Sequence, residues 1–173
     1  MTTIIVVVAL ALLALTLFYV GLRSRRKHAF DRPVRPLDLT AFYTLLDRDD
    51  ETFLREKLSR KQFFQLKRLR IKVTWKYVRR IADNSAVVLR LAALTRLDAD
   101  PNVAEAAAEV ADLATQIRVQ CLVAFAKLTA EFAFPSMELT PAVLAPKYES
   151  LRQNLSRLGS LHPQDVAPLA SAI

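Results

Sequence analysis

The order of apolar and polar positions divides the chain into one long apolar run near its start and a series of helical patterns after it. Between Ile4 and Leu22 no side chain is charged. Because an α-helix rises about 1.5 Å per residue, a run of this length is just sufficient to cross a hydrocarbon core about 30 Å thick. Four basic residues follow it directly: Arg23, Arg25, Arg26 and Lys27. This arrangement predicts a transmembrane helix with a basic flank on its C-terminal side.

A cleaved signal peptide is the competing interpretation of the same segment. Such a peptide carries basic residues before its apolar run and a small-residue cleavage site after it. Here residues 1–3 have no charged side chain, and the basic cluster occupies the place of the cleavage site. A retained anchor therefore fits better. Since positive charge favours the cytoplasmic side, we expect a single-pass protein of a bacterial inner membrane, with its N-terminus outside and its C-terminal domain in the cytoplasm.

After the anchor, residues 28–36 contain two prolines, which favour extended backbone. This linker spans at most about 30 Å, so the folded domain is expected close to the lipid headgroups. Short helices are expected near Leu39–Leu46 and Asp50–Leu58. The stretch from Arg60 to Leu97 has neither Gly nor Pro and follows a capping box of Ser59 and Gln62, so it predicts one long helix.

A second long helix is predicted to follow a tight turn at residues 98–100. Asp100 is suited to the N-cap, Pro101 to the first helical position, and the helix is expected to run to about Phe134. So short a connection makes the two helices antiparallel. The apolar segment Val119–Ala126 is expected in the core. A turn centred on Ala99 gives these pairs: Phe64 with Phe134, Trp75 with Val123 and Phe125, Val78 with Leu122, Leu89 with Val110, Arg90 with Glu109 and Arg68 with Glu131.

A last helix is predicted from Pro141 or Pro146 to Leu158, with Gly159 as its C-terminal stop. Its apolar stripe repeats at helical spacing and is expected to pack on the hairpin: Leu144, Tyr148, Leu151, Leu155 and Leu158. The predicted fold class is therefore all-α, one N-terminal transmembrane helix plus a cytoplasmic helical bundle built on a long antiparallel hairpin. The expected division is an anchor with its flank, a linker, a helical domain and a flexible tail, at residues 1–27, 28–36, 37–159 and 160–173.

The amino-acid composition excludes several classes of functional site but does not identify one. Only two glycines occur, so the glycine-rich loops that hold phosphates are excluded. The single Cys121 has no partner for an intrachain disulfide and is interpreted as a buried thiol. His28 and His162 have no second ligand one helical turn away and are interpreted as surface histidines. We expect no cofactor, no metal site, no catalytic residues and no enzymatic activity.

Three acidic residues on the second long helix are interpreted as ion-pair partners and not as metal ligands. Glu105, Glu109 and Asp112 share a helical face, but the di-iron sites of helical bundles need Glu-x-x-His, and no histidine is near. We expect these carboxylates to pair with Arg90 and Arg96 across the hairpin.

Charge is unevenly distributed along the chain, and this zoning carries the functional hypotheses. Residues 60–97 hold eleven basic residues and one acidic residue, while residues 98–134 hold two basic and six acidic. Five of the basic residues fall on one stripe of the first long helix: Lys61, Arg68, Lys72, Lys76 and Arg79. The stripe has three interpretations: a solvated face partly neutralised by the acidic segment Asp47–Glu56, a contact with anionic lipid headgroups, or a nucleic-acid contact.

The nucleic-acid interpretation is the weakest, because the tether restricts access and the nearby aromatic residues are better used in a core. The leading hypothesis is a membrane-anchored helical interaction module, an adaptor or accessory subunit that holds a protein partner or a second copy of itself close to the membrane. Lipid is its other expected partner. The alternative hypothesis is anionic-lipid or nucleic-acid binding through the basic helix face at residues 60–80.

Overall fold

The computed structural model describes residues 34–136, 139, 141–162, 166 and 169–170. The chain divides into two compact units, Met1–Pro33 and Val34–Ile173, and the described residues all belong to the second. Every regular element within these described ranges is an α-helix, and none is a strand. The predicted all-α bundle is confirmed.

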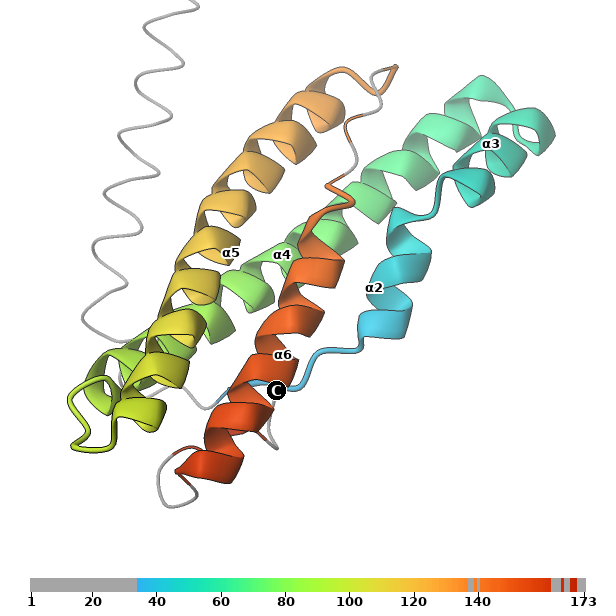
Figure 1. The fold of residues 1–173 in the computed structure, drawn as a ribbon. Helices are drawn as coiled ribbons and strands as arrows, with labels where there is room; N and C mark the ends of the chain where they lie inside the picture. Colours follow the sequence, from blue (N-terminus) through green and yellow to red (C-terminus); the bar gives the residue numbers. More distant parts are fainter. Residues whose placement is uncertain (1–33, 137–138, 140, 163–165, 167–168, 171–173) are drawn as a thin grey trace, which may run out of the picture. The chain divides into compact units, whose positions relative to one another are not determined.

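The two longest helices form the expected hairpin (Figure 1). Helix α4 spans Arg60–Thr95 and helix α5 spans Pro101–Ala133. The capping box before α4 is present, since the Ser59 backbone N–H donates to Gln62 Oε1 at 3.2 Å. The Asp100 side chain accepts from the Asn102 N–H at 2.8 Å, which confirms the N-cap of α5. The capping residues therefore predicted the starts of both helices correctly.

Several contacts of the hairpin differ from the predicted pairs. Glu131 pairs with Lys67, one residue from the expected Arg68. Trp75 stacks on Phe132, with ring centroids 6.3 Å apart, a contact that the predicted pairs did not include. Leu122 is 42% exposed and therefore does not share the buried site of Val78. Phe134, expected against Phe64, is 65% exposed.

Three further helices complete the unit. Helix α2 spans Leu39–Leu46, α3 spans Arg48–Lys57 and α6 spans Leu144–Leu161. Helix α6 packs mainly on α5, α2 packs on α4 and touches α6, and α3 contacts α4 near its start (Figure 1). The Phe42 ring of α2 stacks on Tyr77 of α4 with centroids 5.4 Å apart. Helices α2 and α6 thus form a second layer on one side of the α4–α5 pair.

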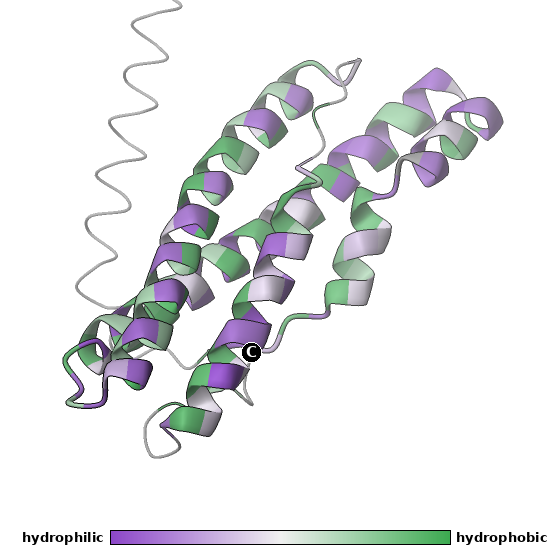
Figure 2. Ribbon diagram, in the orientation of Figure 1, coloured by the Kyte–Doolittle hydropathy of each residue, from purple (hydrophilic) through white to green (hydrophobic). Residues whose placement is uncertain are grey.

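The core lies between these two layers. The predicted stripe of α6 is fully confirmed, because its members are all buried: Leu144, Tyr148, Leu151, Leu155 and Leu158. In Figure 2 the green, hydrophobic segments of α5 and α6 alternate with purple ones, whereas α3 and the adjoining end of α4 are mostly hydrophilic. The core therefore ends before it reaches α3, in which none of the described side chains, Asp49–Lys57, is buried.

The end of α6 differs from the prediction. Gly159 does not stop the helix, which continues to Leu161. Gly159 is buried and has no positive φ, so a glycine without a side chain serves close packing here. Beyond the helix, Val166 is completely buried in the core, and Leu169 and Ala170 pack against it. Part of the segment expected as a flexible tail therefore belongs to the folded unit.

The segment Val119–Ala126 was expected in the core, and this expectation is wrong for half of it. Cys121 and Ala124 are buried at 1% exposure, but Val119, Leu122 and Val123 are 53%, 42% and 43% exposed. The helix has an apolar outer side as well as an apolar inner side, so the apolar run alone did not reveal which side faces inward.

No described helix is both long and apolar enough to span a membrane. The predicted anchor Ile4–Leu22 and its basic flank at Arg23, Arg25, Arg26 and Lys27 lie outside the described residues.

Candidate functional site

The five residues of the predicted basic stripe all lie on the outer surface of α4. They are exposed, and within the part of the chain that the structure describes none of them forms an ion pair: Lys61, Arg68, Lys72, Lys76 and Arg79. The acidic segment 47–56 was considered as a neutralising partner for this stripe. It does fold back on α4, but its Glu51 pairs with Lys67, which points inward. The stripe itself keeps its charge facing solvent.

Two members of the stripe contact an aromatic ring of the other long helix. The Arg68 guanidinium carbon and the Lys72 Nζ lie 5.7 Å and 5.9 Å from the centroid of the Phe132 ring. A cation over a ring face is attracted by its quadrupole and is held in place more firmly than a free side chain. The same ring stacks on Trp75, so the stripe runs along the α4–α5 seam.

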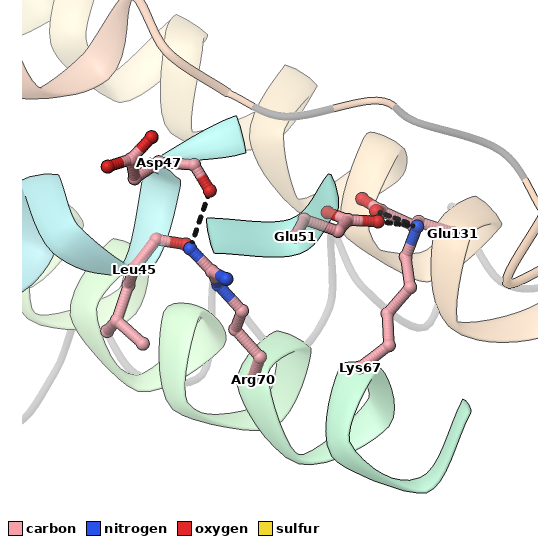
Figure 3. Close-up of polar contacts among 6 residues, drawn as sticks. All are labelled: Leu45, Asp47, Glu51, Lys67, Arg70 and Glu131. Atoms are coloured by element: carbon pink, nitrogen blue, oxygen red, sulfur yellow. Dashed lines mark hydrogen bonds and ion pairs between the residues drawn. The ribbon is translucent and has the colours of Figure 1, made fainter. Parts of the chain in front are cut away.

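A buried charge cluster joins three helices beneath this surface. Lys67 Nζ of α4 lies 2.6 Å from Glu51 Oε1 of α3 and 3.0 Å from Glu131 Oε1 of α5 (Figure 3). The exposed fractions of the three side chains are 3%, 17% and 6% respectively. A lysine buried this deeply is costly unless carboxylates compensate it, and here two do. The cluster fixes the start of α4 against the end of α5.

Arg70 fixes the junction between α2 and α3. Its Nε donates to the Leu45 carbonyl at 2.8 Å, and its Nη2 donates to the Asp47 carbonyl at 2.7 Å (Figure 3). The same Nη2 also donates to the Thr44 carbonyl at 2.8 Å. The last carbonyls of a helix have no partner within the helix, and they carry the negative end of its dipole. A guanidinium group with several fixed donors suits this position. The role of Arg70 is therefore structural, although it belongs to the basic segment.

Asn84 connects the N-terminal end of the folded unit to the core. Its Nδ2 donates to the Tyr148 hydroxyl at 2.8 Å and to the Arg35 carbonyl at 2.9 Å, and its Oδ1 accepts from the Arg35 N–H at 3.3 Å. Burial raises the pKa of Tyr148, and the hydrogen bond from Asn84 offsets part of this rise. Asp83, Asn84 and Ser85 are three poor helix formers in a row within α4. The helix is continuous there, because Asn84 satisfies its amide in the core.

The remaining residues that could carry chemistry, Cys121, Glu109 and His162, are each buried or paired within the fold. Cys121 is buried, and burial raises the pKa of its thiol from about 9.0 to about 12, so it stays protonated and unreactive at neutral pH. Glu109 lies 3.6 Å from Arg157 of α6, a contact that the predicted hairpin pairs did not include. His162 Nε2 lies 3.2 Å from Asp98 Oδ2 and is partly buried, so it is not the free surface histidine that was expected.

Two hollows are near these residues, and neither resembles a substrate pocket. One, of about 370 Å³, is open and lies where α3 meets the start of α4; Arg55 and Arg60 in its wall already stack on Phe63 and Phe64, at 5.4 Å and 5.5 Å. The other borders the Lys67 cluster and has a volume of about 30 Å³, which is room for a water molecule at most.

Among the described residues, no group of three or more His, Cys, Asp or Glu side chains is placed to hold a metal ion. The exposed basic stripe and the apolar surface of α5 beside it are thus the candidate binding surfaces. Sequence reasoning found the first but missed the second, and it also missed Lys67, Arg70 and Asn84 as structural polar residues. Comparison with protein-family models, with curated proteins and with solved structures found no match, so the function has to be argued from this geometry.

Proposed function

We propose that the chain is a non-catalytic, membrane-anchored interaction module, an adaptor or accessory subunit of a membrane-associated assembly. The apolar run Ile4–Leu22 serves as the anchor, and Arg23, Arg25, Arg26 and Lys27 keep its C-terminal end on the cytoplasmic side. A linker of at most about 30 Å then holds the helical unit near the headgroups.

The observation that carries this proposal is the exposed, charge-zoned surface of the folded unit. Five cations on α4 lack an ion pair within the described ranges, and large apolar side chains are exposed nearby on α5. Exposed apolar groups that adjoin charge are typical of surfaces that bind a partner. A rigid platform also suits this role, because the buried Lys67 cluster and the Arg70 contacts fix the short helices on the long ones.

The test is photocrosslinking in native membranes followed by purification in a mild detergent. A benzophenone side chain in place of Tyr43 or Phe53, which are 43% and 59% exposed, samples two separate faces. A protein that crosslinks from one position and not from the other supports a partner with a defined site. A monodisperse monomer without crosslinked neighbours from any exposed position contradicts the adaptor.

The second candidate is binding of anionic lipid or nucleic acid through the basic stripe at residues 60–80. It is favoured by the exposure of Lys61, Lys76 and Arg79 and by the contacts that Arg68 and Lys72 make with Phe132. Each basic residue near an anionic surface contributes about 1 kcal/mol. Salt-sensitive binding to acidic vesicles or to DNA, measured side by side, separates the two ligands.

A further inference from the structure

Among the helices that the structure describes, the α4–α5 pair has one covered side and one uncovered side. On α4, Tyr77 and Asn84 face the second layer, where they contact Phe42 and Tyr148. At about 100° per residue, Arg68, Lys72 and Arg79 lie on the opposite side of the same helix. None of the described helices packs over that side (Figure 1). The basic stripe therefore lies on the uncovered side.

Two exposed apolar residues of α5, Leu122 and Val119, belong to the same side. Phe132 meets Arg68 and Lys72 across the seam, which fixes this edge of α5 next to the stripe. Around the circumference of α5, Leu122 and then Val119 follow Phe132 on the side away from the core. Glu109, which contacts α6, lies beyond them. From Val119 the positions repeat at alternating intervals of three and four residues and carry no charge: Val119, Leu122, Ala126, Thr129 and Ala133. The uncovered side thus combines a cationic stripe with an aliphatic strip.

We propose that this uncovered α4–α5 side, the basic stripe with the α5 strip, lies against an anionic bilayer surface. The proposal rests on the membrane anchoring of the proposed function and specifies how the folded unit is oriented. Cations beside aliphatic and aromatic side chains match a lipid interface, where the cations meet phosphate groups and the apolar groups enter the acyl boundary. Helices α2 and α6 then face away from the membrane, where a protein partner can reach them.

The observations favour a bilayer over the other occupants. A second copy bound through the same side brings two unpaired cationic stripes together, and like charges oppose such an interface. A nucleic acid uses the cations but leaves the exposed Val119 and Leu122 without a role. No residue of the basic stripe or of the α5 strip lines either of the two hollows described above. A docked helix uses a groove for its apolar face, whereas a planar bilayer needs none.

The chain contains its own probe for the test, because Trp75 is the single tryptophan and lies in the α4–α5 seam. The full chain is reconstituted into vesicles of neutral phosphatidylcholine or of a mixture with one third phosphatidylglycerol, each with and without brominated acyl chains. We expect bromine to quench Trp75 at least twofold more strongly in the anionic vesicles, and high salt to remove the difference. Equal quenching in the two lipids overturns the proposal.

Two sets of variants make the test specific. The triple variant Arg68→Glu/Lys72→Glu/Lys76→Glu should abolish the lipid dependence, and the matching Gln triple should reduce it. The control Arg96→Glu/Arg152→Glu/Arg157→Glu changes the charge equally on exposed positions outside the stripe and should retain it. In Trp75→Phe/Tyr43→Trp the probe moves to α2, and quenching should be lost. Quenching that persists from position 43, or that survives the stripe triple, contradicts the assigned orientation.

Failure of the anchor and failure of this inference are distinguishable. Extraction of the wild-type chain by alkaline carbonate shows that the anchor has failed, and cosedimentation of the released chain with the same vesicles then tests the stripe directly. If the stripe triple loses binding to a DNA oligonucleotide, or a crosslink from Leu122 to a protein, while its quenching stays unchanged, the uncovered side serves that ligand and not the bilayer.

Discussion

Lys67 of α4 and Glu131 of α5 form an ion pair of 3.0 Å in which both side chains are more than nine-tenths buried. Glu51 of α3 approaches the same ammonium group at 2.6 Å. A lone acidic residue in the last four turns of α5 and one lysine among the ten basic residues of α4 are thus joined in the interior. This contact sets the hairpin register at its open end and attaches α3, none of whose described side chains is buried.

Replacement of the lysine tests the importance of this cluster. Lys67→Met leaves two carboxylates in a buried site without their cation, so we expect the free energy of unfolding to fall by about 3 kcal/mol or more. Lys61→Met is the matched control on an exposed position and should change stability by no more than about 0.5 kcal/mol. Denaturant titration of both variants provides the comparison. Equal stability of the two variants contradicts a structural role for the cluster.

Arg70 should control the order of the short helices and not the stability of the hairpin. Arg70→Lys replaces a rigid fork by an ammonium group whose donors all sit on one nitrogen, so it cannot reproduce contacts made from both Nε and Nη2. We expect faster amide exchange in α2 and α3, with the exchange of α5 unchanged. Hydrogen exchange followed by mass spectrometry gives the readout, and Arg68→Lys is the control. An even increase across all helices shows that Arg70 supports the whole bundle instead.

The buried thiol gives a pH-dependent prediction. Because burial raises the pKa of Cys121 to about 12, the unfolded chain, whose thiol ionises near 9.0, binds fewer protons between these values. The contribution of the thiol to stability is therefore complete below about pH 9 and is lost as the pH rises towards 12. Cys121→Ala should remove this pH-dependent contribution of the thiol. The difference in Tm between the wild-type chain and Cys121→Ala should therefore narrow or reverse above pH 9. Parallel Tm curves exclude the effect.

Thiol labelling checks the same burial at neutral pH. Cys121 should react with a disulfide reagent only as fast as the unit opens, whereas Cys121→Ala/Leu122→Cys places a thiol one residue further on, where Leu122 is 42% exposed. We expect at least a hundredfold faster labelling of the second chain. Similar rates indicate that the inner side of α5 is accessible.

Val166 should contribute to the core although it lies beyond α6. Its side chain is completely buried, so Val166→Ala should lower the free energy of unfolding by about 1–2 kcal/mol. Val143→Ala makes the same change at a position that is 56% exposed and should have little effect. Chemical denaturation of both variants tests this difference, and an unaffected Val166→Ala contradicts the docking of this segment.

The helices were predictable because their starts and the hairpin turn depend on local chemistry. Ser59 with Gln62, and Asp100 with Pro101, act within a single turn of helix, and the α6 stripe follows one helical period. Gly159 misled the prediction, because a glycine signals a helix stop only where the backbone needs a positive φ. Here it allows close packing inside the helix.

The pairing of charges was less predictable, because it depends on three-dimensional placement. Lys67 has the same chemistry as its neighbours, and only its spacing from Phe63, Ile71 and Thr74 marks it as inward-facing. The exposure of Leu122 was missed for the converse reason. An apolar residue on a helix is assigned to the core by default, and only the absence of a covering helix in the described unit shows that this one is on the surface.

Membrane anchoring is the central claim, and the position of the α4–α5 turn tests it most directly. A protease site inserted after Leu97 should be protected in intact cells and cut after permeabilisation, while the chain stays in carbonate-washed membranes. Leu12→Lys/Leu15→Lys, which costs about 3 kcal/mol per charge at the centre of a bilayer helix, should release the chain. Cleavage from outside intact cells, a mature chain that starts beyond Lys27, or wild-type chain in the carbonate supernatant contradicts the account.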